Sequence, residues 1–409
     1  MGSKRVPEVR FEGFRDEWIA CKLGEKAEIL TGGTPRTQIR EYWEPKEVPW
    51  MSSGEINKKR ILYTDNKISK LGLNNSSARW ISENSVLIAL AGQGKTRGTV
   101  AINLIPLTIN QSIAAIIPKG ELYYEFIYQN LAKRYEELRI ISSGDGTRGG
   151  LNKQILSEIE IVAPSFNEQI KIGNLLKQLD ETIAFQQQEL DTLKQTKQGF
   201  LQKMFPKEGE SVPEIRFSGF SSKWCEQKLK KVFKDFIVPM RDKPKEFSGT
   251  IPWTRIEDIE GRFINGTTSG QYVSEEIIKS MNLKIMPKGS LIVSSSATFG
   301  IVAIVTNDLI TNQTFIGLVP KDMYDIDYLY VFFKSVNIQK KMKRASAGST
   351  IFYISRKQFE EMIGSFPTLE EQTQIGNFFK QLDETIALHE QELNILKQTK
   401  KAFLQKMFV

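Results

Sequence analysis

The side chains best suited to chemistry in this chain are basic or carry hydroxyl groups, and they gather in loops rich in glycine, serine and threonine. Arginine and lysine bind phosphate groups and guanine edges, and serine and threonine hydrogen-bond to phosphates and bases. For any single residue a solvated surface role is the commoner one, so the clusters matter more than their members. The candidate contacts to DNA are Thr34, Arg36, Lys58, Lys59, Arg60, Lys95, Arg97, Arg148, Arg241, Lys243, Arg255, Ser295, Lys343, Arg344 and Ser349.

Motifs for catalysis are weak in this sequence. Residues 89–96, which read Ala-Leu-Ala-Gly-Gln-Gly-Lys-Thr, fit a permissive phosphate-loop pattern. A phosphate-binding loop must open into a helix whose backbone amides hold the phosphates, but the strand-like run 98–102 follows here. His389 is the only histidine, so acid–base pairs and catalytic triads have no candidate. We therefore expect a chain that is not an enzyme by itself and that has no cofactor of its own.

The cysteines also argue against a metal site. Cys21 and Cys225 occupy similar places in the two halves of the chain, which indicates inherited buried thiols rather than a disulfide. With one histidine and no CxxC pair, no metal ligand set is predicted. A reducing cytoplasm is the expected location. No run of about 18 apolar residues occurs in the sequence, so no segment is expected to span a membrane.

Two long helices must carry and space these loops, because residues 168–205 recur almost unchanged as residues 371–408, with 27 of 38 positions identical. Both copies open with a Ser/Thr-x-x-Glu pattern, Ser165 to Glu168 and Thr368 to Glu371, which predicts a capping box. Apolar residues then alternate at spacings of three and four, which is typical of a coiled-coil seam. The predicted seam positions are Ile172, Leu176, Leu179, Ile183, Gln186, Leu190, Leu193, Ile375, Phe379, Leu382, Ile386, His389, Leu393 and Leu396.

One seam position is polar in both copies, Gln186 and His389. A solvated gap in the seam is one interpretation. The other is that the two side chains meet near the crossing point of two antiparallel helices and fix their register. Antiparallel packing is expected because the intervening module must return the chain. About 38 residues at a rise of 1.5 Å give a rod of roughly 55 Å.

The remaining sequence forms two variable modules, each expected to be an α+β globule around a twisted, mostly antiparallel sheet. Residues 85–90 and 290–294 read as buried strands, 98–102 and 300–304 as their partners, and 124–138 and 326–343 as helices. Trp50 and Trp253 are expected mainly as core anchors. The predicted domains are 1–163, a helix over 164–206, 207–366, and a second helix over 367–409. The fold class is therefore α+β, with two modules, two long helices and an internal pseudo-two-fold repeat.

The positive charge lies in the modules. The chain has a formal net charge of +8. Residues 1–165 hold four more basic than acidic residues and residues 206–365 hold five more, whereas 166–205 is balanced and 366–409 has one more acidic residue. A surplus of this size favours nucleic-acid binding only slightly, but its placement in paired modules strengthens the indication.

This arrangement resembles the specificity subunit of a type I restriction-modification enzyme, over essentially the whole chain. The motifs that carry the resemblance are Thr31-Gly-Gly-Thr-Pro35, Tyr42-Trp43, the run Val-Pro-Trp-Met-Ser-Ser-Gly-Glu-Ile at 48–56, Asn110-Gln111 with Asn312-Gln313, and the Pro-x-x-x-Glu-Gln openings at Pro164 and Pro367. The second module departs from the pattern, because residues 236–244 read Phe-Ile-Val-Pro-Met-Arg-Asp-Lys-Pro instead of Thr-Gly-Gly-Thr-Pro.

The resemblance implies two target recognition domains that each read one half of a bipartite double-stranded DNA sequence. The helices would act as a ruler and dock two methyltransferase subunits, which carry S-adenosylmethionine and modify adenine. Two restriction subunits, which use ATP and Mg, can join them. Two alternatives stay open: a two-headed DNA-binding regulator outside restriction, and a protein-interaction adaptor whose modules bind no nucleic acid.

Overall fold

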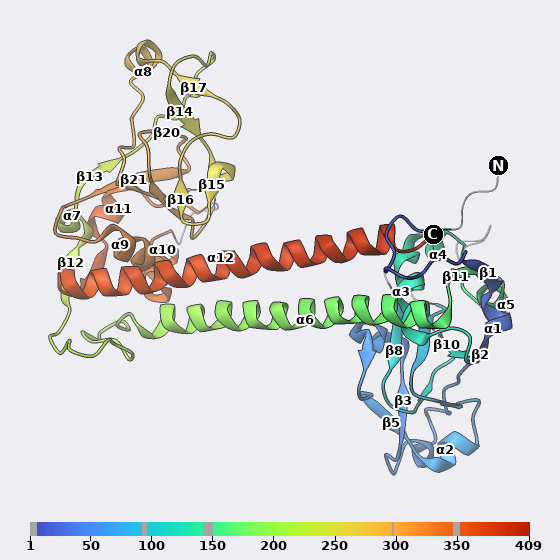
Figure 1. Cartoon of the computed structure of the whole chain (residues 1–409). Coiled ribbons are helices and arrows are strands. Elements are labelled where there is room, and N and C mark those ends of the chain that lie inside the picture. The colour runs from blue at the N-terminus through green and yellow to red at the C-terminus, as the bar shows by residue number, and fades with distance from the viewer. Residues whose placement is uncertain (1–5, 92–95, 142–149, 297, 347–351) are drawn as a thin grey trace. The chain divides into compact units, whose positions relative to one another are not determined.

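The computed structural model describes residues 6–91, 96–141, 150–296, 298–346 and 352–409. It divides into two compact units, residues 1–185 with 393–409, and residues 186–392. Each unit holds one globular head, the adjoining part of one long helix and the far end of the other (Figure 1). We call residues 6–163 head 1 and residues 207–366 head 2. The unit boundaries fall within the long helices rather than at their ends.

Head 1 is built around a five-stranded sheet in the order β2-β10-β7-β8-β4, antiparallel except for the β4–β8 pair. A second sheet has the order β5-β3-β9-β6, and β1 pairs with β11. The strands are β1 (Ile19–Lys22), β2 (Ala27–Thr31), β3 (Val48–Met51), β4 (Arg60–Ile61), β5 (Asn66–Ile68), β6 (Trp80–Ile81), β7 (Ser85–Ala89), β8 (Val100–Asn103), β9 (Leu107–Ile109), β10 (Ile113–Pro118) and β11 (Glu160–Ala163). The helices are α1 (Leu23–Lys26), η1 (Arg40–Tyr42), η2 (Ser53–Lys58), α2 (Lys70–Asn74), α3 (Tyr124–Lys133), α4 (Tyr135–Ile141) and α5 (Lys153–Glu158).

Head 2 repeats this plan with a sheet in the order β13-β21-β18-β19-β16-β15, a smaller sheet β17-β14-β20, and the pair β12-β22. Its strands are β12 (Cys225–Lys228), β13 (Phe233–Ile237), β14 (Ile251–Thr254), β15 (Ile259–Glu260), β16 (Phe263–Ile264), β17 (Tyr272–Val273), β18 (Leu291–Ser294), β19 (Val302–Val305), β20 (Ile310–Thr311), β21 (Phe315–Pro320) and β22 (Ile363–Phe366). Its helices are α7 (Leu229–Val232), η3 (Ile256–Asp258), α8 (Glu275–Met281), α9 (Ile326–Lys334), α10 (Val336–Ala345) and α11 (Arg356–Glu361).

The predicted strands and core anchors are confirmed. Strands β7 and β8 pair antiparallel, as do β18 and β19. Trp50 and Trp253 are buried. The helix predictions need one correction, because each single helix expected over 124–138 and 326–343 is two helices that meet at Arg134 and Ser335. Arg134 sends its side chain to the backbone oxygen of Glu160, so the chain turns where the apolar pattern alone continues.

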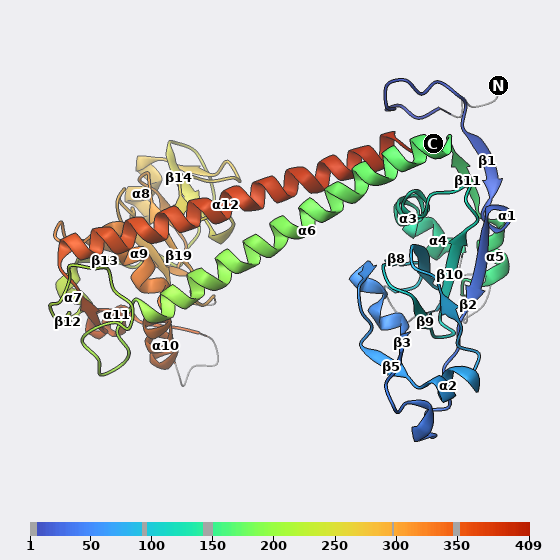
Figure 2. The same cartoon turned by 60° about the horizontal axis from the view of Figure 1, so that its bottom comes forward.

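The two long helices are α6 (Phe166–Lys203) and α12 (Leu369–Lys406). Within each unit they lie side by side in both views (Figures 1 and 2). Contacts in the second unit fix their direction: Gln186 meets His389, and Lys197, eleven residues further along α6, meets Asp383, six residues back along α12. The pairing is therefore antiparallel, as predicted. None of the predicted seam residues is exposed, and Ile172, Leu176, Leu190, Ile375, Phe379 and Leu393 are fully buried.

The helix starts differ from the predicted capping boxes. The carboxylate of Glu168 accepts two hydrogen bonds from Arg10, at 2.7 and 2.8 Å, and that of Glu371 accepts two from Arg216, at 2.6 and 2.7 Å. Each glutamate therefore binds an arginine, and only Thr368 keeps the cap hydroxyl contact, to the amide of Glu371 at 3.4 Å. A charge-assisted bidentate pair is stronger than a neutral cap bond, which explains the exchange.

Each arginine belongs to a repeated segment that also holds the end of the other long helix. We call residues 6–14 and 212–220 the clips. In clip 1 the amide of Val9 donates to the carbonyl of Lys406, and in clip 2 the amide of Ile215 donates to the carbonyl of Lys203. Since the next residue in each clip is the arginine, each clip joins the first turn of one helix to the last turn of the other.

Each head also takes core residues from the far end of the other helix. Met407 and Phe408 are buried in the core of head 1, together with Trp18, Phe126 and Leu176. Leu201, Met204 and Phe205 are buried in the equivalent core of head 2. Phe408 stacks edge-on against Trp18, with ring centroids 6.5 Å apart. The heads are thus not complete without the helix ends.

In the described part of the chain, none of the helices is long and apolar enough to cross a membrane.

Candidate nucleic-acid interface

In each head, loops at one end of the main sheet converge. In head 1 the amide of Leu90 donates to the carbonyl of Ser112, and the amide of Leu151 donates to the carbonyl of Leu90. In head 2 the amide of Ser295 donates to the carbonyl of Thr314, and the amide of Ile354 donates to the carbonyl of Ser295. The same backbone ladder thus gathers the loops after β7, α4 and β9 in head 1, and their counterparts after β18, α10 and β20 in head 2.

An asparagine–glutamine pair marks the centre of each loop cluster. The side-chain oxygen of Asn110 accepts from the amide of Ser112 at 3.1 Å, and that of Asn312 accepts from the amide of Thr314 at 3.1 Å. Asparagine is suited to this turn because its short side chain reaches the backbone two residues further on. The next residues, Gln111 and Gln313, are exposed at the tips of the turns.

In head 1 the segment after β2 packs tightly against this turn. The amide of Gly33 donates to the carbonyl of Ile109 at 2.9 Å, and Trp50 donates its indole N–H to the carbonyl of Gly33 at 3.0 Å. A Cβ on Gly32 would lie 1.8 Å from the carbonyl oxygen of Ile109, so only glycine fits there. This close approach brings the Thr34 hydroxyl within 2.5 Å of the Gln111 side-chain oxygen, to which it donates.

In head 2 an arginine takes the place of Thr34. Ile29 pairs with Ile116 in head 1, and Phe236 pairs with Leu318 in head 2. Since Asn110 and Asn312 define the same turn, counting along the paired strands places Arg241 at the position of Thr34. Arg241 and Gln313 line a hollow of about 450 Å³, together with Val238, Pro239, Ser295, Ser296, Ile316, Tyr353, Ile354 and Arg356. The departure in residues 236–244 therefore keeps the position and changes its chemistry.

Several predicted contacts are exposed. Arg36 follows Thr34 on the loop of head 1, and Lys243 follows Arg241 in head 2. Lys59 is exposed at a turn with a φ of 62°, and Lys343 is exposed on α10. Thr34 and Arg97 are half-buried within the loop cluster of head 1. Lys95, Arg148 and Ser349 lie outside the described residues.

Other predicted contacts are already bound within the protein. Arg60 donates to both oxygens of Glu125, at 2.9 and 2.7 Å, and its side chain is only 17% exposed. Ser295 is buried and donates its hydroxyl to the carbonyl of Thr314. Both side chains therefore have hydrogen-bond partners within the protein, and in Arg60 the partner is a buried carboxylate. Three further predicted contacts donate side-chain hydrogen bonds within the protein: Lys58 to Glu55 and Asp65, Arg255 to Gln271, and Arg344 to Glu208.

Arg60 belongs to a charged cluster where head 1 meets the helices. Its guanidinium lies 3.9 Å from Asp180 on α6, and Asp180 accepts a bond of 2.5 Å from Lys400 on α12. Gln129 on α3 donates to the other oxygen of Asp180 at 2.8 Å. Head 1 is thereby tied to both helices at once.

Head 2 has the matching cluster. Arg262, buried with a side chain 4% exposed, donates to Asp327 at 2.7 Å and lies 3.6 Å from Asp383 on α12. Asp383 accepts from Lys197 on α6. Arg262 lies over the ring of Tyr330, 4.6 Å from its centroid, and burial, followed by the charge of Asp383, raises the pKa of Tyr330 to about 12. Such a shift is the mark of a site from which water is largely excluded.

Residues 89–96 do not form a phosphate loop in their described part. Residues 97–98 form a turn, and strand β8 begins at Val100. A phosphate-binding loop needs a helix N-terminus there to supply amides. Among the residues described, no group of three or more histidine, cysteine, aspartate or glutamate side chains is arranged to hold a metal ion.

Sequence comparison agrees with this two-headed arrangement. The family described as the type I restriction modification DNA specificity domain matches residues 15–195 and 222–398. The chain belongs to this family.

Relatives within the family are distant. The MjaIX type I restriction enzyme specificity subunit of Methanocaldococcus jannaschii is 31% identical over 169 residues, which are 41% of this chain and 39% of that protein. The MjaVIII specificity subunit of the same organism is 21% identical over 432 residues, covering 99% of this chain and 93% of that protein. The crystal structure of a type I restriction-modification S subunit from M. genitalium is 16% identical with a TM-score of 0.63, over 99% of both chains, and shows the same fold.

In this type I specificity chain, each family match covers one head and most of the helix that follows it. Some candidate contacts escaped the sequence prediction. Gln111 and Gln313 stand in a segment that recurs in both modules but were not predicted as DNA contacts, and neither were Tyr353 and Arg356. The one available signal was the repeat of Asn-Gln at matching places, since Tyr353 reaches the hollow through a bridge to Ser296 that only the fold reveals.

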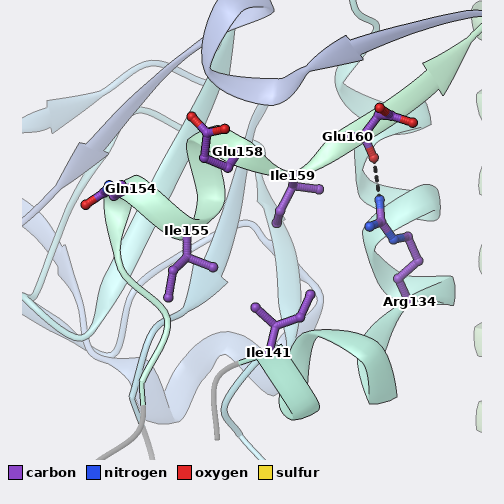
Figure 3. A pocket seen from close by; sticks show the side chains of 7 residues that line it. All are labelled: Arg134, Ile141, Gln154, Ile155, Glu158, Ile159 and Glu160. Carbon is purple, nitrogen blue, oxygen red and sulfur yellow. Dashed lines mark hydrogen bonds between the residues drawn. The ribbon is translucent and has the colours of Figure 1, made fainter. Parts of the chain in front are cut away.

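Head 1 also has a hollow, on the side of α4 and α5. It lies between α4, α5 and β11 and is lined by Arg134, Ile141, Gln154, Ile155, Glu158, Ile159 and Glu160 (Figure 3). Arg134 donates to the backbone oxygen of Glu160 at 2.7 Å and to the carboxylate of Glu137. None of the predicted DNA contacts that the structure describes lines this hollow, and we assign it no role in the interface.

Proposed function

We propose that this chain is the DNA-recognition subunit of a type I restriction-modification complex and that each head reads one half of a bipartite target. The observation that carries the proposal is that the two heads share one backbone framework but present different side chains from it. The same strands and the same asparagine turn present Gln111 and Gln313, whereas the neighbouring position is Thr34 in one head and Arg241 in the other. Two heads with the same backbone framework and different side chains are suited to recognise two different half-sites.

Charge supports the same proposal. Both modules carry a basic surplus while the helices are close to neutral. Exposed Arg36, Lys59, Lys243 and Lys343 are available for phosphate contacts, which fix register and orientation on the duplex. Arg241, beside Gln313, is suited to reading a base edge, since arginine binds guanine through two hydrogen bonds.

The chemistry belongs to partner subunits in this proposal. The chain docks two adenine methyltransferase subunits, which carry S-adenosylmethionine, and restriction subunits that use ATP and Mg join through them. The chain works in the cytoplasm, where these subunits meet DNA. Purified alone, it is expected to show no methyltransferase, nuclease or ATPase activity. An activity of the pure chain that survives Lys95→Ala would contradict this assignment, and an ATPase lost in that variant would restore the phosphate-loop interpretation.

The decisive experiment is genome-wide mapping of methylated adenine in cells with and without this gene. The proposal expects one bipartite motif, two short specific halves separated by unspecified bases, that is methylated only when the gene is present. A methylation pattern that does not change would refute it.

The two alternatives give different outcomes in binding assays. Salt-dependent DNA binding by the chain, with no effect on methylation, would favour a two-headed regulator, because phosphate contacts release counterions. An assembly that shows no DNA binding at any salt concentration would favour the protein-interaction adaptor.

A further inference from the structure

We propose that Gln111 and Gln313 read the same base, an adenine, one in each half of the target. This inference rests on the proposed function and adds which side chains recognise what the two half-sites have in common. Its starting point is that the Asn-Gln dipeptide is retained in both heads, although the loops that surround it have diverged. A position that stays the same while its neighbours change is suited to a feature that both half-sites share.

Hydrogen bonds of the preceding asparagines hold the backbone turns that carry the two glutamines. The backbone amide of Asn110 donates to the carbonyl of Met51, and its backbone carbonyl accepts from the amide of Ile113. Its side-chain oxygen accepts from the amide of Ser112. The turn in head 2 is held in the same way by Asn312, which binds the amides of Thr314 and Phe315. Both glutamines extend from turns whose backbone is fixed on each side, so little side-chain and loop entropy is lost on binding.

The chemistry of the side chain selects the base. A glutamine amide pairs with adenine through two hydrogen bonds, its N–H₂ donating to N7 and its oxygen accepting from the N6 amino group. In head 1 the Thr34 hydroxyl donates to the Gln111 oxygen at 2.5 Å, which orients the amide and leaves that oxygen one further lone pair. Thr34 is therefore a positioning residue for Gln111.

Head 2 shows that the base has room to enter. Gln313 lies on the wall of the hollow of about 450 Å³, with Arg241 beside it and exposed Tyr353 also on its wall. Ser296 is held next to Gln313 by donating its hydroxyl to the Gln313 carbonyl. The exchange of Thr34 for Arg241 leaves the shared reader in place and adds a donor for a neighbouring base, so the half-sites share one base and differ at the next.

The test uses the full chain assembled with its methyltransferase and S-adenosylmethionine. Methylation is measured on a set of duplexes in which each base pair of the wild-type target is changed singly. Gln111→Ala is expected to reduce discrimination roughly tenfold or more at one A·T pair of one half-site, the size expected for loss of a bidentate contact. Gln313→Ala is expected to do the same at one A·T pair of the other half-site only.

Two further variants distinguish a loss of base recognition from a general loss of folding. Thr34→Val keeps the size of the side chain and removes the hydroxyl, so it should weaken discrimination at the same pair as Gln111→Ala, by a smaller factor. Glu83→Ala, on the exposed turn before β7 and at the end of that strand opposite the converging loops, is the control and should change nothing. All variants are compared at equal thermal stability, since a head that unfolds would lower methylation at every duplex alike.

The outcomes distinguish the two proposals. If the wild-type complex methylates a bipartite target and both glutamine variants keep full discrimination at every position, the reading role is wrong and the proposed function stands. If the affected pair is G·C in either half-site, the adenine assignment is wrong. A wild-type assembly that recognises no DNA sequence would overturn both proposals.

Discussion

At the scale of single residues, the charged clusters between each head and the helices show that some basic side chains are bound within the protein. Only the other basic side chains can contact a ligand. Asp180 and Asp383 each lie between an arginine of a head and a lysine of the opposite helix. Removing either aspartate leaves the arginine and the lysine beside it without the anion that they share, although Arg60 keeps Glu125 and Arg262 keeps Asp327. The contribution of these residues is to hold the head on the helices rather than to contact DNA.

Replacing Asp383 by asparagine should therefore destabilise the protein. The change leaves Arg262, which is almost fully buried, and Lys197 without their shared anion. Loss of a partner for a buried polar group costs about 1–3 kcal/mol, and more for a charge. We expect a loss of this order in the free energy of unfolding in urea. Glu384→Gln, the exposed neighbour, is the control and should stay within about 0.5 kcal/mol of the wild type.

An equal response of Asp383→Asn and Glu384→Gln would contradict a structural role for the cluster. A double variant with Lys197→Met should recover part of the loss, because it removes the lysine charge that Asp383 had neutralised.

At this scale the sequence predicted residue types better than residue roles. The hydroxyl-rich and basic segments at 31–36, 96–97, 241–243 and 294–296 belong to the converging loops of the two heads. Arg60 was also predicted to face DNA, yet it binds Glu125, which is 65 residues away along the chain. A run such as Lys58-Lys59-Arg60 does not reveal which member turns inward, because that depends on partners that only the fold brings near.

At the scale of elements, the polar seam position shows what a small departure from an apolar repeat can do. The ring Nδ1 of His389 lies 3.0 Å from the side-chain oxygen of Gln186. The two residues meet, as one of the two interpretations of the sequence predicted. A polar pair in a seam costs stability and favours the one register in which both partners are satisfied.

Replacing both residues by leucine should raise the melting temperature. A half-buried neutral pair exchanged for apolar contacts is expected to gain about 1 kcal/mol, the lower end of the range for such replacements. The single change Gln186→Leu should be less stable than the double variant, since it leaves His389 without its partner. Thermal unfolding followed by circular dichroism gives the melting temperatures of the two single variants, Gln186→Leu and His389→Leu, and of the double variant. A double variant that melts below both single variants would show that the pair stabilises the seam rather than specifying its register.

The clips give a second element-scale prediction. Arg216→Ala removes two short charge-assisted bonds to Glu371, whose side chain is fully buried. We expect a loss of about 2 kcal/mol, within the range for hydrogen bonds to charged groups, and faster hydrogen exchange in residues 212–220. Arg15→Ala, an exposed arginine just beyond clip 1, is the control. Unchanged exchange in clip 2 would mean that its backbone bond to Lys203 suffices.

Long periodic elements were the most predictable part of the fold. The heptad spacing, sustained over five repeats, correctly gave both long helices, and their antiparallel pairing followed from the module between them, which must return the chain. The break at Ser335 was missed, since the apolar pattern runs through it while the hydroxyl of Ser335 turns back to the carbonyl of Phe332. The role of the repeated clips was missed too, because it depends on which helix end lies beside them.

At the scale of the whole molecule, the repeat makes each half of the chain a candidate to pair with itself. The residues that fill the two heads come from one identical hexapeptide, Phe-Leu-Gln-Lys-Met-Phe, at 200–205 and 403–408. A fragment of residues 1–205 should therefore dimerise, with the hexapeptide of each copy completing the head of the other. Two Gln186 side chains would then face each other, and amides can bond to one another.

Sedimentation at micromolar concentration checks the stoichiometry of that fragment. With methyltransferase, the dimer should modify a palindromic target made of the first half-site twice. Phe205→Ala in the fragment should weaken dimerisation, because it removes the ring expected to occupy the place of Phe408. A fragment that stays monomeric, or a dimer that modifies a target without two-fold symmetry, would count against the shared origin of the two halves.

The closing of head 1 by Met407 and Phe408 has a consequence for how the protein is made. The ribosome releases residues 6–163 long before it has made Met407 and Phe408, so the first head to be synthesised waits for the residues that follow α12. Until they arrive, the apolar surface around Trp18 and Phe126 stays open to chaperones and proteases. A frameshift or early stop before residue 407 would therefore remove part of the core of head 1, although that head is encoded far upstream.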